Sequence, residues 1–179
     1  HAQTRLKKDE TIVLELSGET IEVGPVSLAP DENCILPFNM DLNGILLKYA
    51  LAQPVTRWPE GGTVCYLFMV PDGMEEGFVF EEGTVVTEGN HGYGRVYSVV
   101  REDKCCSIYT IPRNKMGDLY QLERGGRRIF VMTDAAVLGD KDEIRLETME
   151  EETLVSVYPC DAFKESSQVI RRKTDKGMW

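Results

Sequence analysis

The stretch VCYLFMV, residues 64–70, decides the fold that the sequence predicts. Seven apolar or aromatic residues in a row are too few to span a membrane, and they are of the types that suit a pleated sheet, so we expect a central strand. The turn-forming segment WPEGG (58–62) precedes it, which predicts a reversal and pairing with residues 49–57. The triplet PDG (71–73) follows, and FVF (78–80) is the next predicted strand, which gives an antiparallel meander.

Outside this stretch, short apolar runs alternate with turn residues. Hairpins are expected around residues 17–19 and 41–44, and further strands at the ranges 95–100, 106–111, 128–133, 144–148 and 154–158. The Gly-rich residues 88–94 are expected to form a loop, and residues 112–123 a short helix. Strands that recur about every ten residues predict an all-β protein, an antiparallel β-sandwich that is jelly-roll-like with little helix.

Length sets the domain organisation that we expect. The 179 residues fit one domain with a substantial core. We assign residues 1–160 to a β-sandwich domain, which could consist of two small packed sheet units with a boundary near residues 86–95. Residues 161–179 are then a tail or a linker to a following domain, and we expect the chain to be part of a longer polypeptide.

Composition excludes several classes of function. With 42% hydrophobic and 28% charged residues, the chain has the composition of a soluble globular protein. The net charge of −10 argues against a nucleic acid or an anionic membrane as partner, because phosphate contacts need clustered Lys and Arg. The sequence has no apolar run of membrane-spanning length, so no membrane insertion is expected.

Metal and thiol chemistry find little support in the sequence. The five Cys are an odd number, and Cys65 and the pair Cys105 and Cys106 lie in apolar contexts, so we expect free and mostly buried thiols. With two His and no zinc-like spacing, neither a metal site nor a cofactor is predicted. The acidic run at residues 140–143 lacks the pattern of a calcium loop, and a charged hairpin turn is the better interpretation.

Two blocks of the sequence carry a resemblance to a known family. The first block consists of LPFNMDLNG (36–44), LKYA (47–50), AQP (52–54) and YLFMVPDG (66–73). The second consists of GDLYQ (117–121) and FVMTDA (130–135). These blocks resemble an accessory β-sandwich segment that follows the catalytic barrel in bacterial beta-galactosidases of glycoside hydrolase family 35. Together the blocks span about half of the chain, and neither contains a catalytic signature.

The resemblance implies a role without catalysis. The two catalytic glutamates of that family lie in the barrel, which takes roughly 200 residues or more and alternating helices that this chain lacks. We therefore expect no catalytic residue here and an accessory module of a larger beta-galactosidase-like glycoside hydrolase. Its partner would be the catalytic barrel of the same polypeptide, in the periplasm or outside the cell.

Two alternatives remain open at this point. The first is an autonomous carbohydrate-binding domain that stacks loop aromatics on an oligosaccharide, for which Trp58 and Tyr93 are the candidates because they lie beside Pro and Gly. Core positions are the commoner use of aromatic residues in a β protein. The second alternative is a small stand-alone sandwich hydrolase, although no constellation of His, Asp and a nucleophile is apparent.

Overall fold

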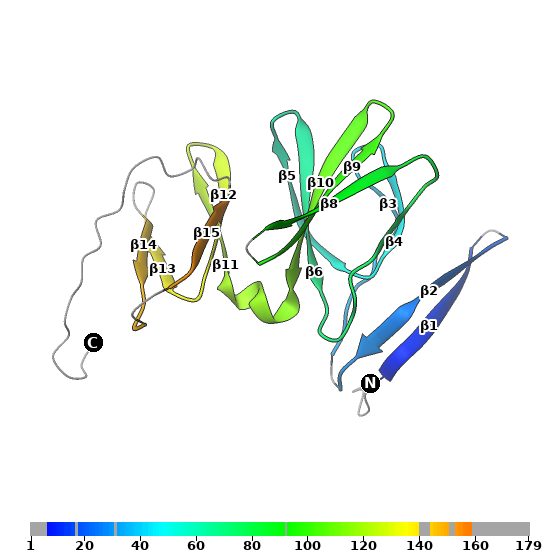
Figure 1. Cartoon of the computed structure of the whole chain (residues 1–179), viewed down its shortest axis with the longest axis horizontal. Helices are drawn as coiled ribbons and strands as arrows, with labels where there is room; N and C mark the ends of the chain where they lie inside the picture. Colours follow the sequence, from blue (N-terminus) through cyan, green and yellow to red (C-terminus); the bar gives the residue numbers. More distant parts are fainter. Residues whose placement is uncertain are drawn as a thin grey trace. The chain divides into compact units, whose positions relative to one another are not determined.

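The computed structural model describes residues 7–16, 18–30, 32–91, 93–139, 144–150 and 153–158. The chain divides into two compact units, His1–Leu119 and Tyr120–Trp179. The first unit includes residues 86–95, near which the sequence suggested a possible boundary between two sheet units. Strands make up nearly all of the regular structure in the described ranges, so the predicted all-β, sandwich-like class is confirmed (Figure 1).

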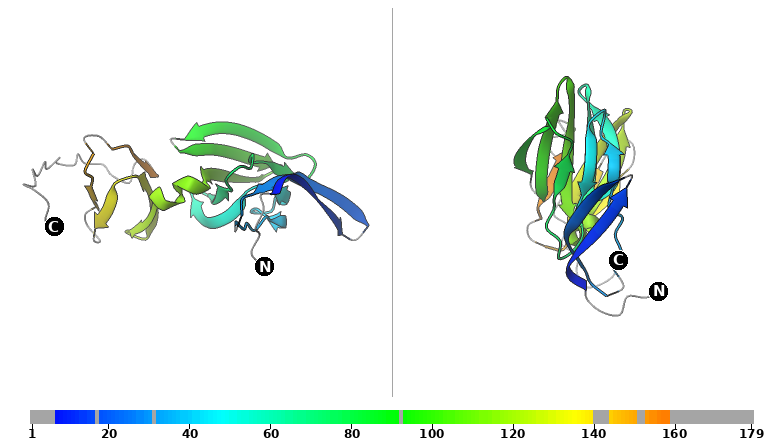
Figure 2. Two further views of the ribbon diagram at one scale, coloured as in Figure 1. Left: turned by 90° about the horizontal axis from the view of Figure 1, so that it is seen from below. Right: turned by 90° about the vertical axis from the view of Figure 1, so that its right-hand side faces the viewer.

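The described residues of the first unit form two sheets and a hairpin. The larger sheet has the order β5 (Gln53–Glu60), β6 (Thr63–Val70), β10 (Lys104–Pro112), β9 (Gly94–Arg101) and β8 (Val85–His91). The smaller sheet has the order β3 (Phe38–Asp41), β4 (Leu46–Ala50) and β7 (Phe78–Phe80). The hairpin of β1 (Lys7–Leu16) and β2 (Glu19–Leu28), drawn in blue in Figure 2, packs beside the smaller sheet through a cluster that includes Val23 and Leu51.

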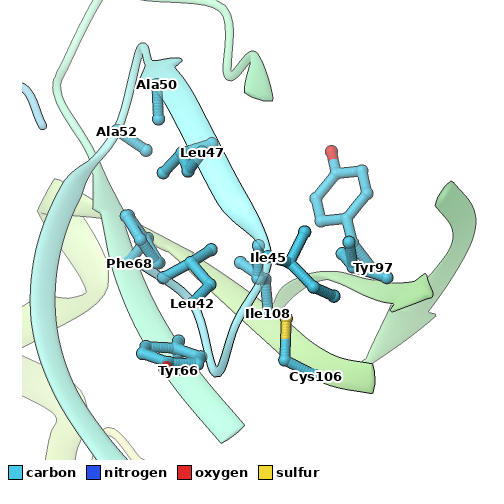
Figure 3. Close-up of a cluster of buried hydrophobic side chains, with 11 residues drawn as sticks. Leu42, Ile45, Leu47, Ala50, Ala52, Tyr66, Phe68, Tyr97, Cys106 and Ile108 are labelled. Carbon is cyan, nitrogen blue, oxygen red and sulfur yellow. The ribbon is translucent and has the colours of Figure 1, made fainter. Parts of the chain in front are cut away.

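The core of the first unit lies between its two sheets. Phe78 of the smaller sheet has its ring centroid 5.2 Å from that of Phe68 and 5.2 Å from that of Tyr97, both of which belong to the larger sheet. Figure 3 shows the buried residues of this cluster, with Leu47 and Ala50 on β4 above Phe68. Burying each large apolar side chain contributes about 1.5–3 kcal/mol, which makes this interface the main source of stability in the unit.

The predicted central strand is correct, but one of its predicted neighbours is wrong. Strand β6 is buried from Cys65 to Met69 and pairs with β5 through the reversal at Gly61 and Gly62, as predicted. Its second neighbour is β10, in parallel register, whereas the predicted neighbour β7 pairs with β4. The connector after β6 carries the chain to the other sheet, where β7 can bury Phe78 against the larger one.

Two local predictions in the second half of this unit are also wrong. The predicted helix over 112–123 is a short 3-10 helix, Arg113–Asp118, followed directly by strand β11 (Leu119–Arg124). Gly117 disfavours a longer helix at this point. The Gly-rich loop expected over 88–94 is mostly strand, because pairing with β9 extends β8 to His91 despite the weak strand propensity of its glycine and asparagine.

The described residues of the second unit form two sheets. One has the order β11, β12 (Arg127–Thr133) and β15 (Val155–Tyr158), and the other is the hairpin of β13 (Ala136–Gly139) and β14 (Ile144–Glu147). Strand β12 is buried from Ile129 to Thr133, as its apolar run predicts. The acidic run 140–143 and the expected tail 161–179 lie outside the described residues.

Candidate functional site

The structure places Trp58 differently from the sequence prediction. Trp58 lies on strand β5 and not in a loop, and only 4% of its surface is exposed. Its ring stacks on Tyr109 of β10, with ring centroids 5.8 Å apart and an interplanar angle of 29°. A buried ring that already stacks on a protein ring offers little surface to a sugar, so the loop environment that motivated the prediction is wrong.

Tyr93, the other predicted sugar-stacking residue, lies in the turn between β8 and β9 and is half-buried. Close to this turn, His91 packs edge-on against Tyr109, with ring centroids 5.8 Å apart. Tyr109 therefore links His91 to Trp58 across the sheet. Neither predicted residue is therefore exposed in the described structure.

Sequence reasoning missed a cleft of about 590 Å³ at one end of the larger sheet. Its walls come from the β6–β7 connector (residues 70–76), Gly94 and Arg95 at the start of β9, Thr110 and Pro112 at the end of β10, and Asn114. The lining combines apolar groups such as Met74 with carboxylates and a guanidinium. A concave surface of this mixed kind suits a small polar ligand.

Arg95 is the central charged group of the cleft. Its Nε lies 3.1 Å from Glu76 Oε1 and 3.4 Å from Glu88 Oε1. A hydrogen bond with the Tyr97 side chain, followed by the charges of Glu76 and Glu88, raises the pKa of Arg95 above its ordinary value. The phenol of Tyr97 belongs to the core cluster, and burial raises its pKa. The half-exposed guanidinium thus contacts the phenol of Tyr97 and two carboxylates.

Glu76 has one carboxylate oxygen that differs from the other. The side chain is 12% exposed, and Oε1 accepts the contact with Arg95. Oε2 is buried and has no hydrogen-bond donor among the described residues. A buried acceptor without a donor is costly and uncommon, so a hydroxyl or amine that reached this oxygen would gain a favourable interaction.

The floor of the cleft is built on a close approach of two strands. A Cβ added to Gly94 would lie 2.0 Å from the backbone oxygen of Thr110, so only glycine fits. The same oxygen accepts a hydrogen bond from His91 Nε2 at 3.0 Å. The Thr110 hydroxyl accepts from the Arg95 N–H at 3.1 Å and donates to the Arg95 carbonyl oxygen at 3.3 Å. These bonds lock β9 to β10 where the cleft begins. The only sequence signal for them was a glycine directly before a strand.

The described cysteines are not organised as a reactive site. Cys34, Cys65, Cys105 and Cys106 are free thiols, and Cys160 lies outside the described residues. Cys65 and Cys106 are buried, as their apolar neighbours predict, whereas Cys34 is half-buried and Cys105 is exposed. Burial raises the pKa of Cys106 to about 12, which keeps this thiol protonated and unreactive at neutral pH.

In the described ranges, no group of three or more His, Cys, Asp and Glu side chains is placed to hold a metal ion. Those ranges also contain no helix of the length and apolarity that crossing a membrane requires. Comparison of the sequence with models of known protein families and with curated protein sequences finds no match.

Proposed function

We propose that the chain is a non-catalytic accessory β-sandwich module of a larger beta-galactosidase-like glycoside hydrolase. In this role it supports the catalytic barrel of the same polypeptide during β-galactoside breakdown, in the periplasm or outside the cell. The proposal rests on the position in the fold of the residues that resemble this family. Six of the eleven buried residues of the main core cluster come from the first block that resembles this family: Leu42, Leu47, Ala50, Ala52, Tyr66 and Phe68.

A resemblance concentrated in core positions supports a structural role. Core residues determine how two sheets pack, whereas binding and catalysis use side chains that a ligand can reach. The carboxylates of Glu76 and Glu88 agree with this interpretation, since both contact Arg95. A glycosidase pair instead flanks an open space that holds the glycosidic bond.

The proposal is tested in the protein from which this chain comes. The complete reading frame should encode a catalytic barrel before His1, and the protein should hydrolyse a chromogenic β-galactoside, whereas this chain alone should not. Deleting the chain from that protein should lower its melting temperature and activity while leaving the barrel sequence intact. A reading frame without a barrel, or turnover by this chain that a substitution within it abolishes, would refute the proposal.

The cleft favours a second candidate function, the binding of an oligosaccharide. The lining carries three carboxylates, Asp72, Glu75 and Glu76, and one guanidinium, Arg95, so it disfavours anionic ligands, and a neutral polyhydroxyl ligand can use both its acceptors and its donor. Sugar hydroxyls both donate and accept, which matches the carboxylates and the guanidinium of the lining.

One titration separates the two candidates. Galactose and lactose are titrated into the chain by calorimetry, and the support module predicts no heat of binding. The second candidate predicts binding that Arg95→Gln abolishes. Arg101→Gln is the matched control, because Arg101 forms a comparable pair with Glu81 at 3.5 Å outside the cleft.

A further inference from the structure

The two edges of the five-stranded sheet differ in how they are protected. Strand β5 forms one edge and carries the features that block pairing with another strand. Pro54 and Pro59 lack an N–H donor, and the register with β6 shifts between Pro54 and Thr56. Prolines, a bulge and a charged Arg57 are the usual protection of an exposed edge.

Strand β8 forms the other edge and has none of these features. Its seven residues pair with β9 from Val85 to His91 without a register shift, and the sequence VVTEGNH contains neither proline nor lysine. In an antiparallel pair, every second residue directs its N–H and C=O away from the neighbouring strand. Among the described residues, no other strand supplies backbone hydrogen bonds to this edge.

Apolar side chains are exposed beside this open edge. Val85 and Val86 are 63% and 42% exposed, and Val100, directly opposite Val85 on β9, is 43% exposed. The edge is also locally neutral in a chain of net charge −10, because Glu88 is the only formally charged residue from 83 to 91 and it contacts Arg95 at 3.4 Å. Two such edges can therefore approach with little repulsion.

We infer that β8 pairs with β8 of a second copy of this chain, in antiparallel register about a twofold axis at Val86. This register places Val86 opposite Val86 of the second copy and Val85 opposite Thr87 of the second copy. Glu88 then lies opposite Thr84 of the second copy. A register centred on Glu88 would place two like charges directly opposite each other, which is unfavourable. The two larger sheets then join through Val85, Val86 and Thr87 of each copy, an isologous contact.

Sedimentation velocity of the intact chain tests the inference over about a hundredfold range of concentration, since dimer formation follows mass action. The wild-type chain should pass from monomer to dimer. Val86→Lys should weaken association by about tenfold or more, because it places two ammonium groups opposite each other at the seam. Val79→Lys is the matched control: Val79 is 37% exposed on β7, the edge strand of the smaller sheet, and the dimer should persist.

Hydrogen exchange gives a measurement that needs no variant. Alternate amides of β8 should exchange more slowly at high protein concentration than at low concentration, and those of β5 should not change. A monomer at every concentration, or a dimer that Val86→Lys leaves intact, would overturn the inference. If β8 instead pairs with a strand of a different protein, its amides should be protected only after that protein is added. This outcome would also contradict the inference that β8 pairs with a second copy of this chain.

Discussion

Replacing Gly94 by alanine tests the close approach of β9 and β10 that forms the floor of the cleft. The added Cβ would lie 2.0 Å from the Thr110 oxygen, whereas real Cβ contacts essentially never fall below 3.0 Å, so the two strands must separate by about 1 Å. The obstacle is backbone and cannot rotate away. The Thr110 oxygen is also fixed by His91, and the Thr110 hydroxyl is fixed by the backbone of Arg95.

The cost of this substitution follows from three terms. Overpacking a well-packed site costs about 1–3 kcal/mol. Weakening the hydrogen bonds around Thr110 adds about 1 kcal/mol, and the lower entropy of the unfolded alanine chain offsets about 0.5 kcal/mol. We expect a loss of about 2.5 kcal/mol in the free energy of unfolding, which lowers the melting temperature by roughly 10 °C for a unit of this size.

Thermal and urea denaturation followed by circular dichroism measure the effect. Gly117→Ala is the control, because nothing lies within 4 Å of its added Cβ and its φ is not in the left-handed region. Its stability should match that of the wild-type chain to within about 0.5 kcal/mol. A Gly94→Ala chain as stable as the Gly117→Ala chain would show that β9 and β10 do not approach as described.

Three further predictions concern other parts of the first unit. Trp58→Ala should lower the free energy of unfolding by about 3–5 kcal/mol, because it removes a buried ring that packs on Tyr109, and an unchanged melting temperature would mean that the ring is exposed after all. Iodoacetamide at pH 8 should modify Cys105 and spare Cys106, which peptide mapping can show. Because burial raises the pKa of Cys106 from 9.0 to about 12, the contribution of this thiol to the free energy of unfolding is complete below pH 9 and is lost as the pH rises toward 12. Arg113→Gln should lower the free energy of unfolding, measured by urea denaturation, by about 2 kcal/mol. The reason is that the carboxylate of Glu32, which is 7% exposed and 2.8 Å from Arg113, loses its cation. Lys115→Gln, at a more exposed ion pair, is the control and should cost under about 0.5 kcal/mol.

Local signals in the sequence predicted most of the strands and turns. The Asn43-Gly44 turn, the Gly61-Gly62 reversal and the apolar runs of β6 and β12 each act over a few neighbouring residues, and each prediction is confirmed. The position of β7 depends instead on which sheet can bury Phe78. No signal near residue 78 carries that information, because the rings that contact it, Phe68 and Tyr97, are distant in sequence.

The cleft was hidden from the sequence for the same reason. Glu76, Arg95 and Thr110 come from three separate elements, and only the pairing of β9 with β10 and the path of the β6–β7 connector bring them together. The prediction for Trp58 is wrong for a different reason. Neighbouring proline and glycine indicated a loop, although Pro59 lies within an edge strand. An edge position tolerates a proline, so the residue types beside Trp58 did not reveal its burial.

The parallel pairing of β6 with β10 constrains the order in which the chain can fold. Cys65 lies beside Ser107, so one side of the most apolar strand stays open until residues 104–112 have been synthesised. During that interval, TVCYLFMV is an uncharged strand with a free edge, the type of segment that nucleates intermolecular β-aggregation. A chain that terminates before Lys104 should therefore accumulate as insoluble aggregates, whereas a chain that includes β10 closes this edge from within.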